Sequence, residues 1–313
     1  MRCLSIHLTD LCNSKCTFCV VASPLYTKDT VNYDEVVAFL RAHAGTYDVV
    51  NFHGGEPTIH PRFLETLALI QTLGFREVHL QTNATRLADE DFARKTFELG
   101  VKLFIISLHG DDPQTHDTQT HTPGGFNRVI ASIQNVKALG ARVRTNTVVT
   151  RANLQRLPSI ARVACDAGVD HFNISNIHPV GSALFALGRI LPSFEEVRTH
   201  LYPAIDHCLA RGRRVTLEGF PYCSVAERQD LHLNNEYRDI RMMIRGRVIE
   251  DYDAFMSDSM RVFGSPCQAC GVRKACGGVY REYISYRGWN EFRPLPGTGA
   301  GEVAPEVPTT VAS

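Results

Sequence analysis

The chain has 313 residues, of which 44% are apolar and 21% are charged, as in an ordinary globular protein with one sizeable core. Lysine plus arginine and aspartate plus glutamate are equal at 33 each, so there is no net charge to attract a nucleic acid or a membrane surface. No apolar run approaches the roughly 18 residues of a membrane span, and the N-terminus has no secretory signal. We therefore expect a cytoplasmic protein whose ten cysteines serve metal binding or catalysis rather than disulfides.

The first feature along the chain is a short apolar strand, Cys3–His7, followed closely by three cysteines spaced C-x₃-C-x₂-C: Cys12, Cys16 and Cys19. A loop this tight can direct three thiolates at one point, and thiolates hold iron–sulfur clusters. Three ligands leave one iron of a four-iron cluster open to a substrate. The alternative is a zinc knuckle or a few buried thiols, but a structural zinc site needs four ligands.

Short β-rich runs then alternate with helical patterns up to about residue 180, which predicts βα units around a parallel sheet. The predicted strands are Cys3–His7, Val49–His53, Glu77–Thr82, Lys102–Leu108, Arg142–Val149 and His171–Ile177. The predicted helices are Tyr33–Ala44, Pro61–Leu73, Asp89–Leu99, Phe126–Leu139 and Asn153–Ala167. These units make an α/β fold, an open and partial (β/α)6 barrel, whose active site we expect at the C-terminal ends of the strands.

Glycines and polar residues stand at several of these strand ends. The second strand ends in Gly54-Gly55-Glu56, where two glycines allow close approach to a ligand and the carboxylate can accept from an ammonium group. Further candidates on or after the later strands are Asn83, Ser107, Arg144, Asn146, Ser175 and His178. The segment Asp111–Gly125 is polar and rich in turn residues, and we expect it to lie over the site as a long loop.

A second group of cysteines follows a predicted helix, Phe194–Arg211, and a predicted strand, Arg213–Leu217. The elements of residues 224–262 are not predicted. The group consists of a C-x₂-C-x₅-C cluster and one cysteine about forty residues earlier, namely Cys267, Cys270, Cys276 and Cys223. Four cysteines suit zinc and an iron–sulfur cluster equally well. From Pro294 the chain has almost no charge, and we expect a disordered tail.

The first cysteine motif, with the aromatic Phe18 before its last cysteine, resembles the signature of the radical S-adenosylmethionine (SAM) superfamily. The resemblance implies a [4Fe-4S] cluster on the three cysteines, whose open iron chelates the methionine part of SAM. Reductive cleavage then releases a 5′-deoxyadenosyl radical that abstracts hydrogen from a C–H bond.

The resemblance also implies which residues bind SAM. Gly54-Gly55-Glu56 matches the family's motif for the SAM amino group, and the strand ends correspond to contacts with its carboxylate, ribose and adenine. The SAM-binding residues expected on this basis are Phe18, Gly54, Gly55, Glu56, Asn83, Ser107, Arg144, Asn146, Ser175 and His178.

The C-terminal cysteines resemble the auxiliary-cluster extension called twitch, a shortened relative of the SPASM domain. This implies a second [4Fe-4S] cluster with Cys223 as the fourth ligand. The alternative is that Cys223 stays a free thiol and donates hydrogen to a substrate radical. The expected domains are a radical SAM barrel over 1–212, a twitch-like domain over 213–293 and a disordered tail over 294–313.

Relatives with such extensions modify either peptides or small molecules. Many peptide maturases carry a leader-recognition domain ahead of the motif, whereas eleven residues precede Cys12 here. We therefore expect a small polar substrate (a sugar, aminocyclitol or nucleoside) in antibiotic or other natural-product biosynthesis. The outcome would be dehydrogenation, epimerisation or C–C coupling, with a flavodoxin or ferredoxin as electron donor. The alternatives are a peptide maturase, an iron–sulfur electron carrier without SAM chemistry, and a zinc-stabilised binding module.

Overall fold

The structure is a computed structural model that describes residues 1–233, 237 and 239–297. Its main sheet has nine strands in the order β7-β6-β5-β4-β3-β2-β1-β8-β9, parallel throughout except for the antiparallel pair β8–β9. These strands are β1 Arg2–Thr9, β2 Val49–Gly54, β3 Glu77–Thr82, β4 Val101–Ser107, β5 Arg142–Val148, β6 His171–Ser175, β7 Arg214–Glu218, β8 Asp239–Ile244 and β9 Arg247–Ile249. A two-stranded antiparallel ladder joins β10 Arg261–Val262 to β11 Val279–Tyr280.

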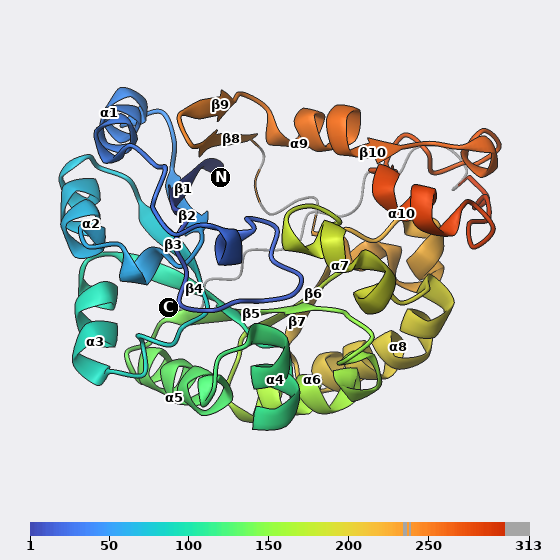
Figure 1. The fold of residues 1–313 in the computed structure, drawn as a ribbon, viewed down its shortest axis with the longest axis horizontal. Coiled ribbons are helices and arrows are strands. Elements are labelled where there is room, and N and C mark those ends of the chain that lie inside the picture. Colours follow the sequence, from blue (N-terminus) through green and yellow to red (C-terminus); the bar gives the residue numbers. More distant parts are fainter. Residues whose placement is uncertain (234–236, 238, 298–313) are drawn as a thin grey trace.

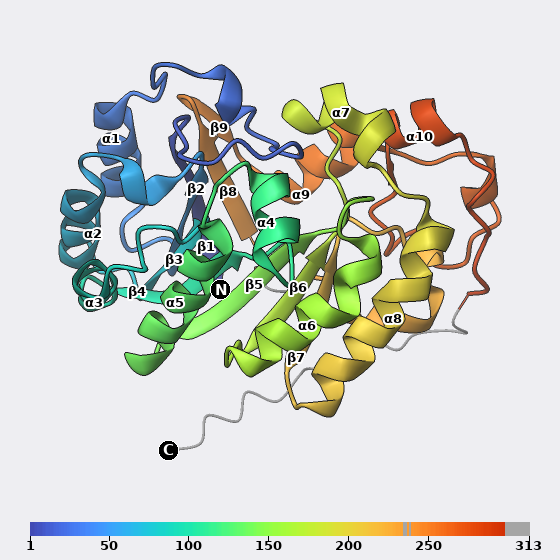
Figure 2. The same cartoon turned by 60° about the horizontal axis from the view of Figure 1, so that its bottom comes forward.

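The helices lie mainly around the outside of the curved sheet, where α1, α2, α3, α5, α6 and α8 form an arc (Figure 1). Figure 2 shows α6 and α8 side by side on this outer surface. The helices are α1 Tyr33–His43, α2 Phe63–Thr72, α3 Glu90–Glu98, α4 Pro113–Thr120, α5 Gly125–Ala138, α6 Leu157–Asp166, α7 Ser182–Ile190, α8 Phe194–Ala210, α9 Tyr252–Phe255 and α10 Arg281–Arg287. The mostly parallel sheet confirms the predicted α/β partial barrel.

Alternation along the strands separates an apolar outer face from a polar inner face. In β1, Leu4 and Ile6 are fully buried in the core, whereas Ser5 and His7 point to the other side of the sheet. The other strands place polar residues on the same inner face: His53, Gln81, Ser107, Asn146, Asn173, Ser175 and Glu218. Buried polar groups are costly without partners, so a face of this kind suits polar ligands and water.

Two helices before residue 194 were absent from the sequence prediction, as were α9 and α10 later in the chain. Within Asp111–Gly125, predicted to be a loop, α4 forms because Asp112 caps it, accepting from the Thr115 backbone N at 2.7 Å, and Pro113 occupies its first turn. The segment has no apolar periodicity, so the pattern of hydrophobic residues did not indicate this helix. The helix α7 was not predicted either.

The main sheet extends past the predicted domain boundary at residue 213. The strand β7 pairs with β6, and β8 pairs with β1 on the opposite side of the sheet. Strands up to Ile249 thus belong to the main sheet, and the described part of the chain after Ile249 contributes no strand to it. A twitch-like unit stays a prediction. The predicted tail, 294–313, lies outside the described residues from residue 298 onward. In the described ranges, no helix combines the length and the apolar character needed to cross a membrane.

Candidate functional site

The first cysteine loop starts at Asp10, directly after β1. The buried Asp10 carboxylate accepts from Arg245 Nε at 2.7 Å and from the Thr30 backbone N at 3.1 Å, and it lies 2.8 Å from His7 Nε2. Burial alone would raise the pKa of Asp10, but these donors hold it at about 2. Because Arg245 lies between β8 and β9, Asp10 ties the loop to the last hairpin of the sheet. Sequence reasoning missed this residue, since its main partner is 235 positions away.

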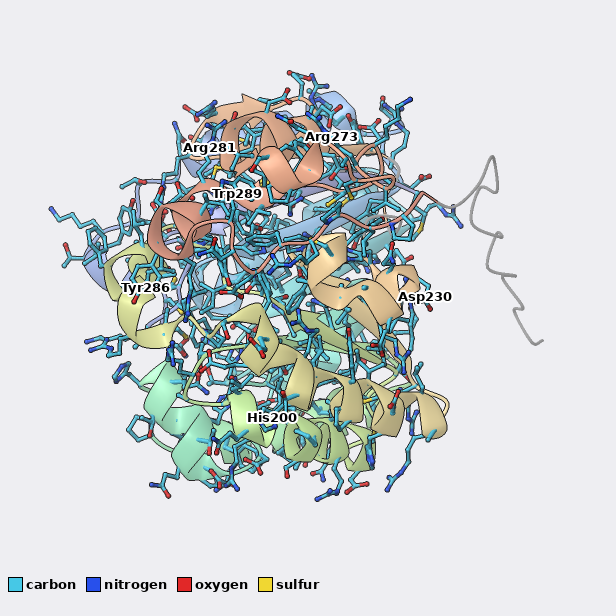
Figure 3. The ribbon with its side chains drawn as sticks, turned by 90° about the vertical axis from the view of Figure 1, so that its right-hand side faces the viewer. His200, Asp230, Arg273, Arg281, Tyr286 and Trp289 are labelled. Atoms are coloured by element: carbon cyan, nitrogen blue, oxygen red, sulfur yellow. The ribbon has the colours of Figure 1, made fainter. Side chains whose placement is uncertain are left out.

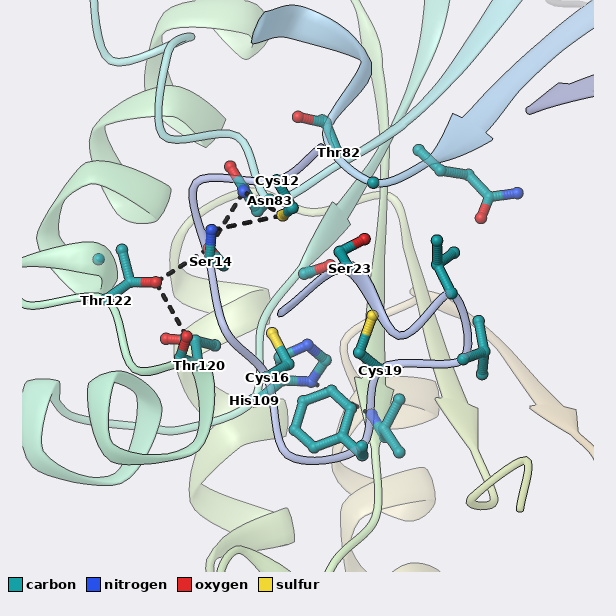
Figure 4. A pocket seen from close by; sticks show the side chains of 18 of the residues that line it. Cys12, Ser14, Cys16, Cys19, Ser23, Thr82, Asn83, His109, Thr120 and Thr122 are labelled. Carbon is teal, nitrogen blue, oxygen red and sulfur yellow. Dashed lines mark hydrogen bonds between the residues drawn. The ribbon is translucent and has the colours of Figure 1, made fainter. Parts of the chain in front are cut away.

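A cavity of about 210 Å³ lies at the C-terminal ends of β1 to β5 and is lined by all three thiols of the loop, Cys12, Cys16 and Cys19 (Figure 4). Burial raises the pKa of Cys12 to about 12 and also raises that of Cys16. The bare Cys12 and Cys16 thiols are therefore protonated at neutral pH, and three thiolates side by side require bound cations. The irons of an iron–sulfur cluster meet that requirement, so the donor set fits such a cluster.

Gly54, the last residue of β2, and Gly55 after it bring the end of that strand against the cysteine loop. Gly55 N donates to Thr9 O at 2.7 Å, and Glu56 N donates to Leu11 O at 2.8 Å. A Cβ at Gly55 would lie 2.0 Å from Leu11 O, and Gly54 has a φ of +129°. Both glycines line the cavity. Their lack of side chains therefore permits the close packing and also leaves backbone facing the cavity.

The structure places the Glu56 side chain in a network of hydrogen bonds within the protein, and its predicted contact with SAM stays a prediction. Glu56 is fully buried, and it does not line the cavity. Its carboxylate accepts from Thr58 N at 3.1 Å, Thr58 Oγ1 at 2.6 Å, Thr82 Oγ1 at 2.7 Å and Asn83 N at 2.6 Å. Burial raises the pKa of Glu56, while these hydrogen bonds oppose the increase. Through these hydrogen bonds the carboxylate ties together the ends of β2 and β3.

Three other predicted residues, Phe18, Asn83 and Ser107, do line the cavity. The Asn83 side-chain N donates to Asn13 Oδ1 at 2.7 Å and to Ser14 Oγ at 3.1 Å. The same atom lies 3.7 Å from the Cys12 sulfur. Asn83 therefore joins the end of β3 to the cysteine loop and stands beside a thiol at the same time.

Besides His53 in β2, two histidines contribute to the wall of the cavity, His109 after β4 and His116 in α4. The Val148 backbone N donates to His109 Nδ1 at 3.3 Å, and the His109 backbone N donates to His116 Nδ1 at 3.2 Å. Because each Nδ1 accepts, each neutral ring carries its proton on Nε2. Burial lowers the pKa of both rings, to about 4 for His116. Together with His53, whose pKa burial lowers to about 3, the site thus contains three neutral imidazoles, one of them supplied by the helix that was not predicted.

The remaining four predicted SAM-binding residues do not line this cavity: Arg144, Asn146, Ser175 and His178. They surround Glu218 at the end of β7 instead. Ser175 Oγ donates to Glu218 Oε2 at 2.9 Å, and His178 Nε2 lies 3.9 Å from Glu218 Oε1. Burial would raise the pKa of Glu218, but the nearby Arg144 and the hydrogen bonds from Ser175 and Asn173 help to hold it below its ordinary value. The structure therefore divides the predicted set into a group at the thiols and a group around a charged carboxylate.

The cysteines of the second group line one smaller hollow together: Cys223, Cys267, Cys270 and Cys276. The Leu295 backbone N donates to the Cys270 sulfur at 3.5 Å, and the Gly278 backbone N donates to the Cys276 sulfur at 3.4 Å. Burial and the neighbouring cysteines raise the pKa of Cys223 to about 11. Cys223 thus lies with the C-terminal cysteines and not at the wall of the first cavity.

Aromatic side chains enclose this second hollow. Phe263 and Phe292 belong to its wall, and the Arg273 guanidinium lies over the Phe263 ring at 5.2 Å. Trp289 packs edge-on against Phe292 with ring centroids 5.6 Å apart. Figure 3 shows this side of the molecule with Arg273 and Trp289 labelled. Such a shell limits the access of water to a bound group.

Comparison with known proteins agrees with this geometry. The family model described as the Radical SAM superfamily matches residues 6–164. A probable GTP 3′,8-cyclase of Sulfurisphaera tokodaii is 30% identical over 181 residues, which cover 57% of this chain and 56% of that protein. A probable GTP 3′,8-cyclase of Metallosphaera sedula is 29% identical over 200 residues, which cover 62% and 59%. The chain thus spans less than two thirds of the length of these relatives.

Solved structures share the fold. SuiB of Streptococcus suis bound to S-adenosylmethionine superposes with a TM-score of 0.66 at 18% identity, covering 94% of this chain and 76% of SuiB. SuiB bound to the precursor peptide SuiA gives 0.65 at 16% identity, covering 94% and 74%. The protein anSMEcpe with bound AdoMet gives 0.55 at 20% identity, covering 69% and 64%. The likeness to SuiB extends over the C-terminal segment as well as the barrel.

Proposed function

This chain belongs to the radical SAM superfamily of enzymes, and we propose that it uses SAM to abstract hydrogen from a carbon of a small polar substrate. The observation that carries the proposal is the convergence of the three N-terminal thiols, the Gly54-Gly55 backbone and Asn83 on one cavity. We propose that Cys12, Cys16 and Cys19 hold a [4Fe-4S] cluster there. When bound, this cluster supplies the electron that cleaves SAM to a 5′-deoxyadenosyl radical.

The chain's own residues have distinct roles in this proposal. The Gly54-Gly55 backbone approaches the amino end of SAM, and Asn83 and Ser107 supply hydrogen bonds from neighbouring strand ends. The apolar ring of Phe18, 4.6 Å from the His109 ring, covers the third cysteine's side of the cavity and helps to exclude water. His109 and His116 offer Nε2–H donors and carry no charge, so they do not repel a cationic sulfonium.

We propose that the C-terminal cysteines hold a second [4Fe-4S] cluster. The grouping of Cys223 with the three later cysteines around one hollow supports this assignment, and so do the backbone N–H groups that donate to two of their sulfurs. Four thiolates leave no iron open, so such a cluster would carry electrons rather than bind substrate. In a dehydrogenation it would accept the second electron, and a flavodoxin or ferredoxin would reduce the first cluster.

The polar inner face of the barrel supports a small hydrophilic substrate, a sugar, aminocyclitol or nucleoside. Apolar side chains are turned outward to the helices, while amide, hydroxyl and carboxylate groups face the interior. The resemblance to GTP 3′,8-cyclases is compatible with this class. We propose dehydrogenation, epimerisation or C–C coupling in the biosynthesis of an antibiotic or related natural product.

A second candidate function is the modification of a peptide. The observation in its favour is the likeness in fold to SuiB, which binds the precursor peptide SuiA and aligns over most of this chain. A peptide enzyme would need an open path for an extended chain to the thiol-lined cavity.

Turnover in deuterated water tests the proposed function and separates its outcomes. The reduced, reconstituted enzyme is incubated with SAM and with candidate sugars, aminocyclitols, nucleosides and peptides, and the products are analysed by mass spectrometry. One deuterium gained at carbon indicates epimerisation, and a loss of two mass units indicates dehydrogenation. The proposal is contradicted if only peptides are changed, or if no small molecule increases the release of 5′-deoxyadenosine.

A further inference from the structure

The inner faces of β4 to β7 carry two rows of residues that begin at the wall of the thiol-lined cavity. Each row consists of residues that are paired across neighbouring strands. One row is Ser107, Asn146, Asn173 and Thr216, and the other is Val148, Ser175 and Glu218. Their first members, Ser107 and Val148, both line the cavity. Since neighbouring strands in a sheet lie about 4.8 Å apart, a molecule next to the cavity can reach Glu218 along these rows.

Glu218 is only partly satisfied by the protein. Its Oε2 accepts from Asn173 Nδ2 at 3.0 Å and from Ser175 Oγ at 2.9 Å. Its Oε1 faces His178 Nε2 at 3.9 Å, which is too long for a hydrogen bond. In the part of the chain that the structure describes, His178 Nε2 is buried without a hydrogen-bond partner. The Glu218 side chain is nevertheless 34% exposed, so one carboxylate oxygen can be reached by a solute.

The charges around this carboxylate define what it can bind. Arg144 lies close enough to lower the pKa of Glu218, which keeps the carboxylate ionised, while burial lowers the pKa of His178 and leaves that ring neutral. The nearby Arg261 lies over the Tyr280 ring at 5.1 Å and donates to the Tyr280 hydroxyl at 3.4 Å. Arg261 is thus turned to Tyr280, and the accessible functional group at the end of this row is an anionic acceptor.

Glu218 also stands at the junction between the two groups of cysteines. Its neighbour Gly219 has a φ of +73°, and a Cβ there would lie 3.1 Å from His178 Nε2 and 3.4 Å from the Tyr280 hydroxyl. The chain then runs from Gly219 directly to Cys223 at the second hollow. A substrate held at Glu218 would therefore lie between the thiol-lined cavity and the C-terminal cysteines.

We propose that Glu218, supported by Asn173, Ser175 and His178, binds a protonated amino group of the substrate. The substrate class is then an amino sugar or aminocyclitol rather than a phosphorylated nucleotide. This assignment rests on the proposed function, because it places the substrate within reach of the cavity assigned to SAM. An ammonium group would donate to the open Oε1, and a neighbouring hydroxyl would donate to or accept from His178.

Binding measurements on the oxidised, cluster-loaded full chain with SAM test this site, because no turnover occurs without a reductant. The probes are glucosamine and streptamine, each compared by calorimetry with its neutral counterpart, glucose or scyllo-inositol. We expect the amines to bind at least tenfold more tightly than the neutral molecules. Glu218→Gln should weaken amine binding by about 10- to 100-fold and leave neutral binding unchanged. The matched control is Glu98→Gln, at an exposed glutamate of α3, which should change neither.

The proposal is overturned if amines and neutral sugars bind equally, if Glu218→Gln binds amines like the wild type, or if GTP binds more tightly than any amine. Cluster absorbance and thermal unfolding establish that Glu218→Gln is folded. If it is not, Glu218→Asp keeps the charge but withdraws it by one methylene, and it should retain part of the amine preference. Release of 5′-deoxyadenosine by the reduced wild type without substrate reports separately on the proposed SAM chemistry.

Discussion

At the scale of single residues, Glu56 shows how a motif residue can act through its neighbours. Its carboxylate receives donors from Thr58, Thr82 and Asn83, and a glutamine would turn an NH₂ group toward some of them. We expect Glu56→Gln to lower the free energy of unfolding by roughly 1–3 kcal/mol, measured by urea unfolding of the iron-free protein. SAM binding should weaken only as a consequence, because Asn83 is displaced.

The matched control is Glu65→Gln, at an exposed glutamate that pairs with Arg62 at the surface. Its free energy of unfolding should change by less than about 1 kcal/mol. A Glu56→Gln protein with wild-type stability but weak SAM binding would instead support a direct contact between Glu56 and SAM.

Cys223 has two possible roles, ligand of the second cluster or free hydrogen donor, and its position in the second hollow favours ligation. We expect Cys223→Ala to lose up to about four irons or to change the spectrum of the second cluster, with SAM cleavage retained. Iron analysis and electron paramagnetic resonance measure this. The control is Cys165→Ala, at a buried cysteine of α6, which should keep its full iron content. Full iron in Cys223→Ala would instead point to the free thiol.

At the scale of elements, Asp10 joins the cysteine loop to the β8–β9 turn through Arg245. Its folded pKa of about 2 lies below the ordinary value of about 3.9, so its charge stabilises the fold above about pH 4 and this contribution is lost as the pH falls toward 2. We expect Asp10→Asn to be less stable than the wild type by about 2–3 kcal/mol at pH 6, with a gap that shrinks between pH 4 and pH 3.

Urea unfolding of the iron-free proteins at several pH values measures that gap. Asp166→Asn removes an exposed carboxylate that pairs with Arg211, and it should show a small difference at every pH. A gap between Asp10→Asn and the wild type that is independent of pH would mean that Asp10 acts through packing and not through its charge.

The contact between the end of β2 and the cysteine loop gives a second prediction at this scale. A Cβ at Gly55 would meet Leu11 O, a backbone atom that can move only with the loop. We expect Gly55→Ala to reduce the iron bound by the first cluster and to abolish most SAM cleavage. Gly140→Ala is the control: Gly140 has a φ of +81° and open space around it, so it should cost about 1–2 kcal/mol of stability but leave iron content unchanged. Equal iron contents in the two variants would contradict this role for Gly55.

The sequence predicted those elements whose pattern is local. Leu4 and Ile6 alternate with polar residues, and Gly74 and Gly140 follow helices, so β1 to β7 and the helices α1, α2, α3, α5 and α8 were predicted within one or two residues. The helix α4 was missed because its signal is a cap, Asp112, without an apolar face. The pairing of β8 with β1 was missed because it depends on partners more than 230 residues apart along the chain.

For the candidate site too, the local motifs were predicted and the long-range arrangement was not. The thiols and Gly54-Gly55 form compact motifs, and the structure brings both to the cavity. Strand ends indicated polar residues but not which ligand each would face. Ser107 lies at the cavity, while Ser175, on a neighbouring row, lies beside Glu218. Only the register and curvature of the sheet decide that division.

At the scale of the whole molecule, the inner face of the sheet leads from the thiol-lined cavity along the paired residues Val148, Ser175 and Glu218, and Cys223 of the second hollow follows five residues after Glu218. In the function proposed above, a substrate would lie between the SAM site and the second cluster. That proposal gives a catalytic role to the first group of thiols only.

The most direct test of this account is the release of 5′-deoxyadenosine from SAM, measured by liquid chromatography and mass spectrometry on the reduced, reconstituted full chain. We predict that the wild type releases it and that the Cys12→Ala, Cys16→Ala, Cys19→Ala triple variant releases none, although the variant keeps the roughly four irons of the second cluster. A triple variant that cleaves SAM as the wild type does would contradict the account.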